Sequence, residues 1–284
     1  MANVRIITDV TAYLDPEFVT RHRVTVLPVE VRFGEETFQI SPKGGADSLF
    51  QRMAETQALP AQATIPAALF QQTYARLSRE TDEILVLLSS SKLNQAYDQA
   101  QMVARSYLGR CRIVVMDTMT ASWGLGLVIE AAARAAEKGH SLDQIVRLVR
   151  GILPHIYLVF IVERLDYLER GQRISPAQAL LGTMLRIRPV LLLEDGEIIP
   201  MEKVRTRELA IEKLASFVAE FTRIQRITIL SSPLNGDRQE MIEQLREQLS
   251  QILPKRQFPV VEYDPVLACH LGPQALGVGV YEGF

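Results

Sequence analysis

Short apolar runs rich in β-branched residues alternate with amphipathic stretches through the first half of this chain. The apolar runs predict buried strands at Val4–Thr8, Val24–Phe33, Ile84–Leu88, Arg112–Met116 and Ile156–Val162. The helical periodicity between them predicts helices at Ser48–Gln57, Pro66–Glu80, Asn94–Leu108, Ala121–Lys138 and Leu142–Leu153. Strand–helix alternation of this kind favours a mostly parallel sheet that is covered by helices on both faces.

The pattern changes near residue 160. The Asp195-Gly196 pair separates two apolar runs and is typical of a hairpin turn between Val190–Leu193 and Glu197–Met201. Two long helices and two further strands follow, at Thr206–Thr222, Asp237–Leu253, Arg226–Leu230 and Pro259–Asp264. We therefore expect an α/β protein of two domains with a ligand cleft between them. Residues 1–160 would contain the mostly parallel sheet, and residues 161–284 a mixed sheet.

Charge and hydropathy narrow the classes of function. The 284 residues include 31 Lys+Arg and 33 Asp+Glu, for a net charge of −2, which gives no whole-chain case for nucleic-acid binding or a polybasic membrane anchor. The longest apolar run, Ile156–Val162, is too short to span a membrane. The first ten residues read as a strand and not as a targeting segment. We therefore expect a cytoplasmic protein with at most transient membrane contact.

Sequence motifs of common enzymes and metal sites are absent. There is no G-x-G-x-x-G, Walker A, H-E-x-x-H or G-x-S-x-G pattern. Cys111 and Cys269 have no C-x-x-C spacing and the four histidines do not cluster, so we expect no metal, no cofactor and two buried, inert thiols. The G-x-G of Gly124 and Gly126 lies in a predicted helix, where small residues usually serve close packing.

Polar segments that follow predicted strands are candidate binding loops, because open α/β sheets bind ligands at the C-terminal ends of their strands. Thr64 stands two residues before Pro66, at a predicted helix start. Ser89, Ser90 and Ser91 follow an apolar strand and precede a helix, an arrangement that can hold an anion. The alternative for both segments is that their hydroxyls only cap the following helix.

Two more candidates lie in the second half. Arg173 follows Gly171 and leads into a Ser-Pro helix start, so its guanidinium can bind a carboxylate or phosphate, the alternative being a solvated arginine. His270 precedes Gly272-Pro273, and a fixed turn is one way for a loop to present an imidazole, the alternative being a structural histidine. The residues alone therefore predict a two-domain α/β protein whose interdomain cleft accepts an anion.

The order of these segments resembles the bacterial DegV family, which includes the fatty-acid-binding subunits of fatty-acid kinase. The resemblance runs through nearly the whole chain and rests on Ile7-Thr8-Asp9, Ser90-Ser91-Lys92-Leu93, Asp117-Thr118, Ser122-x-Gly124-x-Gly126, Leu165-x-Tyr167-Leu168-x-x-Gly171-x-Arg173-Ile174-Ser175, Arg188-Pro189-Val190, Asp195-Gly196, Arg205 and His270-x-Gly272-Pro273. If Pro66 is aligned with the family's proline, Thr64 takes the position of a usual serine.

The resemblance implies a non-catalytic carrier that holds one long-chain fatty acid, such as palmitate, stearate or oleate, in an interdomain tunnel. In this scheme a fatty-acid kinase catalytic subunit converts the presented carboxylate into an acyl phosphate. The resemblance also implies a kinase contact at Arg205 and carboxylate-binding groups at Thr64, Ser90, Ser91, Arg173 and His270. Two alternatives remain: an enzyme in which Ser91 or His270 acts on a small anion or ester, and a lipid-sensing binding protein without a kinase partner.

Overall fold

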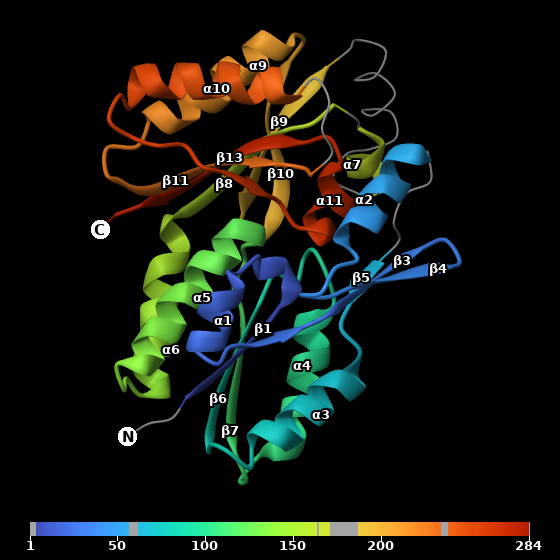
Figure 1. The fold of residues 1–284 in the computed structure, drawn as a ribbon, viewed down its shortest axis with the longest axis vertical. Helices are drawn as coiled ribbons and strands as arrows, with labels where there is room; N and C mark the ends of the chain where they lie inside the picture. The colour runs from blue at the N-terminus through green and yellow to red at the C-terminus, as the bar shows by residue number, and fades with distance from the viewer. Residues whose placement is uncertain (1–3, 57–61, 164, 171–186, 234–237, 284) are drawn as a thin grey trace. The chain divides into compact units, whose positions relative to one another are not determined.

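The chain divides by its internal contacts into two compact units in the computed structural model (Figure 1). The structure describes residues 4–56, 62–163, 165–170, 187–233 and 238–283. Unit 1 consists of Met1–Leu49 and Pro60–Pro154, and unit 2 of Phe50–Leu59 and His155–Phe284. The sequence analysis placed the boundary between the domains at residue 160. The internal contacts instead divide the chain after Pro154 and assign the early segment Phe50–Leu59 to unit 2.

Unit 1 contains a four-stranded parallel sheet of order β2-β1-β6-β7. Its strands are β1 (Arg5–Asp9), β2 (Thr25–Leu27), β6 (Glu83–Leu88) and β7 (Arg112–Asp117). The inner strands β1 and β6 are buried at almost every position, as expected for a parallel sheet covered on both faces. The chain moves from β1 to β2 in one direction and from β6 to β7 in the other. The strand order therefore reverses between β1 and β6, which makes this the switch point of the sheet.

Helices cover both faces of this sheet, as predicted (Figure 1). One face carries α3 (Ala67–Leu77) and α4 (Ala96–Ala104), and the other carries α5 (Ser122–Glu137) and α6 (Leu142–Ile152). A Cβ atom on Gly126 of α5 would lie 2.6 Å from the carbonyl oxygen of Ala12, in the short helix η1 (Val10–Ala12). The packing role predicted for Gly126 is therefore confirmed.

A second sheet of unit 1 is antiparallel, with the order β4-β3-β5. It consists of β3 (Val29–Phe33), β4 (Glu36–Ile40) and β5 (Gln62–Thr64). The prediction of one continuous strand over Val24–Phe33 is wrong, because β2 ends at Leu27 and β3 begins at Val29. Pro28 stands between them, and its missing N–H group cannot join a strand ladder. The helices α1 (Pro16–Arg21) and α2 (Ala46–Glu55) flank these strands in sequence.

Unit 2 is built around a six-stranded sheet of order β10-β9-β8-β13-β11-β12. Its strands are β8 (Ile156–Ile161), β9 (Arg188–Glu194), β10 (Glu197–Val204), β11 (Ile224–Ser231), β12 (Val260–Glu262) and β13 (Leu276–Glu282). Only β11 and β12 pair in parallel, so the predicted mixed sheet is confirmed. Asp195 and Gly196 have φ values of 48° and 80° and connect β9 to β10, as a tight hairpin turn requires.

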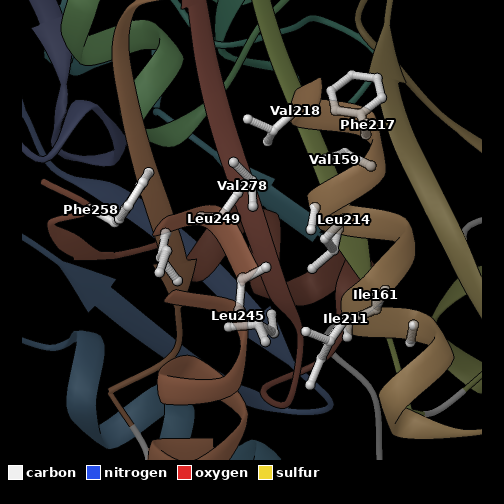
Figure 2. Packing of buried hydrophobic residues seen from close by; sticks show 14 of the residues in the cluster. Val159, Ile161, Ile211, Leu214, Phe217, Val218, Leu245, Leu249, Phe258 and Val278 are labelled. Carbon is white, nitrogen blue, oxygen red and sulfur yellow. The ribbon is translucent and has the colours of Figure 1, made fainter. Parts of the chain in front are cut away.

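The core of unit 2 lies between this sheet and the helices α9 (Arg207–Ala219) and α10 (Arg238–Ile252). Figure 2 shows side chains of both helices meeting those of β8 and β13, with Leu214 and Leu245 among them. Alternate residues of a strand face opposite sides of a sheet. Phe160 therefore points away from this core, and its ring lies 6.3 Å from that of Tyr263. The Tyr263 ring lies 5.9 Å from the ring of Phe50 on α2, which makes Phe50 part of unit 2.

Unit 2 also contains two short helices, α7 (Asp166–Arg170) and α11 (Pro265–Leu271), and they contact each other. Within the described ranges, the structure contains no helix that is both long and apolar enough to cross a membrane.

Candidate functional site

Polar residues gather at the C-terminal edge of the parallel sheet of unit 1. Asp9 is the last residue of β1, Asp117 is the last residue of β7, and the serine loop, Ser89–Ser91, follows β6 between them. Leu88 lies opposite Asp117 in the β6–β7 pairing, so the serine loop and the end of β7 are neighbours. This edge includes the switch point between β1 and β6, where open α/β sheets leave a crevice for ligands.

Hydrogen bonds account for the first two serines of the loop. The Ser89 hydroxyl accepts a bond of 2.7 Å from the Asn94 side-chain amide, and the Ser90 hydroxyl accepts one of 3.1 Å from the main-chain N–H of Lys92. The Asn94 side chain itself accepts a bond of 2.8 Å from the N–H of Ala96, at the start of α4. The N-cap residue of α4 is Gln95, which makes no side-chain cap bond, so the structure gives no support to the alternative that a serine of this loop is the helix cap.

The third serine is bound to Asp117. Its hydroxyl lies 2.5 Å from Oδ2 of Asp117, and its main-chain N–H donates to the same oxygen at 3.2 Å. The other carboxyl oxygen, Oδ1, accepts a bond of 2.8 Å from the N–H of Met119. Asp117 thus holds together the loops that follow β6 and β7. Met119 has a φ of 50°, in the left-handed region that costs free energy for a residue other than glycine.

Asp9 is a completely buried carboxyl at the end of β1. Its Oδ1 atom accepts bonds of 2.8 Å and 2.5 Å from the main-chain N–H and the hydroxyl of Thr11. Burial raises the pKa of Asp9 above its ordinary value, although hydrogen bonds from Thr11 and from the main chain of Ser89 oppose this shift. The Oδ2 atom is buried and has no partner of good hydrogen-bond geometry among the described residues. Asp9 therefore keeps a proton more readily than an exposed aspartate.

A pocket of about 610 Å³ lies within unit 1 beside Asp9. Its wall is mostly apolar and includes Leu14, Val26 and Ile40, and Tyr13 also lines it. An apolar pocket with a few polar groups at one end is the usual form of a small-molecule binding site. The pocket reaches this edge at Asp9, whereas the serine loop is not part of its wall and follows the neighbouring strand β6. Both lie at the C-terminal edge of the parallel sheet, which is the best candidate site in unit 1.

Thr64, also predicted to bind the ligand, is the half-buried last residue of β5. It lies opposite Glu30 in the antiparallel sheet, whereas Ser90 and Ser91 follow a strand of the parallel sheet. The first residue before α3 is Pro66, and no side chain in the described part of the chain caps this helix. The structure therefore gives no support to the alternative that Thr64 is a helix cap.

The remaining predicted site residues belong to unit 2. His270 is half-buried in the last turn of α11, so the expectation of a histidine on a loop is wrong. The sequence analysis did not predict α11. Its N-cap is Asp264, whose Oδ1 accepts bonds of 2.8 Å and 2.9 Å from the main-chain N–H groups of Val266 and Leu267. Pro265 suits the first position of the helix, where no N–H group is needed. Arg205 is exposed between α9 and β10, which is an edge strand of the sheet. Arg173 lies outside the described residues.

Two site residues had no role in the sequence-based prediction, Asp9 and Asp117. Each is an acidic residue directly after an apolar run that forms a strand of the parallel sheet. The rule that singled out the serine loop applies equally to them, because all three segments end neighbouring parallel strands. The signal was therefore present in the sequence, in residues noted only as part of the family pattern.

The Cys111 thiol donates to the carbonyl of Thr81, and the Cys269 thiol donates to the carbonyl of Pro265. Burial raises the pKa of both thiols, Cys111 and Cys269, which keeps them protonated and unreactive. In the part of the chain that the structure describes, no three His, Cys, Asp or Glu side chains lie close enough together to hold a metal ion.

The fold and the site define an α/β protein of two units with a candidate small-molecule site at the switch point of a parallel sheet. Residues 3–283 match a family model described as "Uncharacterised protein, DegV family". The chain belongs to the DegV family.

Three similar proteins show how far this relationship extends. A DegV domain-containing protein of Streptomyces coelicolor is 35% identical over an alignment of 285 positions that covers 98% of each chain. The crystal structure of a fatty acid binding DegV family protein from Streptococcus agalactiae has a TM-score of 0.86 at 26% identity, over 100% of both chains. A structure described as fatty acid binding of a DegV family protein, from Thermus thermophilus, has a TM-score of 0.82 at 28% identity and covers 99% of this chain and 100% of that one.

Proposed function

We propose that this protein binds one long-chain fatty acid, such as palmitate, stearate or oleate, and acts as a carrier and not as an enzyme. The observation that carries the proposal is the similarity in fold and sequence, over the full length of the chain, to fatty acid binding proteins of the same family. The apolar pocket beside Asp9 supports it, since such a wall suits an alkyl chain.

The energetics of an acyl chain agree with a carrier. A chain of about 16 carbons gains roughly 12 kcal/mol from burial, at about 0.8 kcal/mol for each CH₂ group. Polar groups then need only to orient the head group and offset its desolvation. We propose that the head group is met by Thr64, Ser90, Ser91, Arg173 and His270, the set that the resemblance implies.

We further propose that a fatty-acid kinase catalytic subunit phosphorylates the bound acid and that Arg205 contacts this partner. The exposed position of Arg205, between β10 and α9, is compatible with a contact to another protein. The alternative of a hydrolytic enzyme gains no support from Ser91, because its hydroxyl is bonded to a carboxylate that also accepts two main-chain N–H groups. A serine nucleophile normally has a histidine as its base.

Mass spectrometry of an organic extract tests lipid binding directly. We expect protein purified without added lipid to carry a near-stoichiometric long-chain fatty acid, and Ser91→Ala to lower this occupancy. Ser250→Ala is the matched control, because Ser250 is exposed on α10 and its hydroxyl donates to the carbonyl of Arg246 in its own helix. An empty extract, together with no uptake of added oleate or palmitate, would contradict the proposed function.

A second assay tests the kinase partner separately. Arg205→Ala should bind oleate as the unchanged protein does but support less acyl-phosphate formation when a fatty-acid kinase catalytic subunit and ATP are added. If Arg205→Ala supports the same rate as the unchanged protein, Arg205 does not contact the kinase. If no kinase acts on the bound acid, the proposed role as a kinase subunit is wrong, and the alternative of a lipid-sensing binding protein replaces it.

A further inference from the structure

The short helix α1 separates two hollows of unit 1. One is the apolar pocket described above, of about 610 Å³, and its wall includes Pro16 and Val19 of α1. The other, of about 460 Å³, is lined by Phe18 and Arg21 of the same helix and by residues of α5. Residues 16 and 19 share one face of a helix, and residues 18 and 21 share the opposite face. One face of α1 therefore closes the apolar pocket, while the other is turned towards α5.

Burial holds α1 only weakly in this position. None of its six side chains is fully buried, whereas most side chains of α5 are. The free energy that fixes a helix in a fold comes largely from the apolar surface it buries. Segments with few buried apolar contacts are those that open at low cost while the rest of the protein stays folded. We therefore expect α1 to separate from unit 1 more easily than the helices that cover the parallel sheet.

The contact between α1 and α5 depends on the ring of Phe18 (Figure 1). This ring lies 4.2 Å from the ring of His22, and the guanidinium carbon of Arg134 on α5 lies 5.8 Å from its centroid. The Nδ1 atom of His22 lies 3.4 Å from Oε2 of Glu137, also on α5. Ring and cation contacts of this kind are individually modest at partly exposed sites. They form a small attachment that can break and form again.

The ends of α1 have the form of hinges. The helix is capped as one piece, because the Asp15 side chain accepts bonds of 2.7 Å and 3.2 Å from the main-chain N–H groups of Glu17 and Phe18. Outside it, Tyr13 and Arg23 have φ values of 47° and 52°. The left-handed region costs free energy for residues other than glycine, so both gain free energy when they leave it. Hinge motions are absorbed by a few residues at the ends of an element.

We propose that α1 is a hinged flap over the apolar pocket, which rotates away from α5 about Tyr13 and Arg23 to admit and release the fatty acid chain. This inference rests on the proposed function, since it assumes that the chain occupies this pocket. Phe18 holds the flap closed, and Val19 on the opposite face forms part of the wall that the bound chain meets. Substitutions on the two faces of one helix therefore affect different rate constants.

Stopped-flow binding of cis-parinaric acid, a fluorescent fatty acid, measures these rate constants. Association is followed on mixing, and dissociation is followed by displacement with excess oleate. In Phe18→Ala both rate constants should increase about tenfold, because the flap must open for entry and for exit and its attachment is weakened equally in both states. The Kd should then stay within about twofold of that of the unchanged protein. Val19→Ala keeps the attachment but removes part of the wall, so dissociation alone should become faster and Kd should rise.

A control and a cross-link complete the test. Phe221→Ala removes a half-buried ring of unit 2, which lies 4.8 Å from the ring of Tyr157, and it should leave both rate constants unchanged. Cysteines in place of His22 and Glu137, joined by a short bismaleimide, should slow association and dissociation together, because they fasten α1 to α5. The double variant without the linker, and the unchanged protein treated with the same reagent, are the references for this measurement.

The outcomes distinguish the flap from the function on which it rests. If neither cis-parinaric acid nor oleate binds, the proposed function is contradicted. Hydrogen exchange then tests the flap alone: Phe18→Ala must speed exchange of the α1 amides and leave those of α5 unchanged, and unaltered exchange in α1 overturns the inference. If the lipids bind but Phe18→Ala raises Kd without changing the association rate, Phe18 only supports the pocket, and the inference is overturned while the function stands.

Discussion

Asp9 and Asp143 are carboxyls in opposite environments, and their effects on stability should have opposite dependence on pH. Burial raises the pKa of Asp9, so the folded state favours its neutral form. The stability that this group contributes is fully present below its pKa in the unfolded chain, about 3.9, and is lost as pH rises through the raised pKa of the folded state. Asp9→Asn cannot ionise and can keep the acceptor for Thr11. The Tm of this variant relative to the unchanged protein should therefore increase as pH is raised from 3.5 to 8.

Asp143 is the control, because its contribution to stability should depend on pH in the opposite direction. It is exposed on α6, and a hydrogen bond from Arg112 lowers the pKa of Asp143 below its ordinary value. The stability of that pair is present above the unfolded pKa and is lost as pH falls through the folded pKa. Asp143→Asn should therefore lose Tm relative to the unchanged protein as pH rises. Thermal unfolding at several pH values measures both, and parallel curves for the two variants would contradict the assignment of Asp9.

At the scale of single elements, the contact between α5 and η1 depends on the absence of one side chain. Alanine is favoured over glycine inside a helix by up to about 1 kcal/mol. Gly126→Ala should nevertheless destabilise the protein by about 1–3 kcal/mol, because its Cβ atom would lie 2.6 Å from the carbonyl oxygen of Ala12 and force a shift. Urea denaturation measures the change in the free energy of unfolding.

The same substitution at Gly151 is the matched control for this prediction. Gly151 is exposed in α6, so Gly151→Ala should be neutral or stabilise the protein by up to about 1 kcal/mol. If Gly126→Ala also stabilises the protein, the close approach between α5 and η1 does not limit the fold.

Periodicity predicted the elements whose apolar pattern is local and strong. The strands β6 and β7 and the helices α5 and α6 appear within a few residues of their predicted bounds. The strand β13 was missed because its Gly-x-Gly pattern has low strand propensity. The reason for one of these glycines is visible only in three dimensions, since a Cβ atom on Gly277 would collide with the ring of Phe160 on the neighbouring strand.

The candidate site also depends on contacts that local sequence patterns do not reveal. The position of the serine loop after an apolar strand was predictable from local sequence. The pairing of Ser91 with Asp117 was not, because it joins residues 26 positions apart through the register of two strands. A loop's hydrogen-bond direction depends on such partners, so the sequence located the hydroxyl but could not tell what it offers to a ligand.

At the scale of the whole molecule, unit 2 includes a segment from early in the chain. Phe50 is completely buried and packs on Tyr263, far away in sequence. Phe50→Ala should lower the stability of unit 2 by about 3–5 kcal/mol, the usual cost of removing a buried phenyl ring. Hydrogen exchange measures the effect by location, and amides of β11 and β13 should lose protection while those of β6 and β7 keep theirs.

Phe70→Ala is the matched comparison in unit 1. Phe70 is equally buried, on α3, with its ring 5.9 Å from that of Tyr74. This variant should show the reverse pattern, with protection lost first in β6 and β7. Equal loss of protection in both sheets for either variant would contradict the division of the chain into these two units. A segment boundary of this kind leaves no periodic signal, which is why the sequence predicted two domains but not the segment Phe50–Leu59.

The position of β13 has a consequence for the growing polypeptide during translation. This strand lies between β8 and β11 in the sheet, although it follows both in the chain. A nascent chain that has emerged as far as α11 therefore contains β10-β9-β8 and β11-β12 as separate ribbons. β8 and β11 each then present an unpaired edge, and such edges promote aggregation. Unit 2 can close its sheet only after residue 282 has left the ribosome, so any chaperone protection must last until that late stage of synthesis.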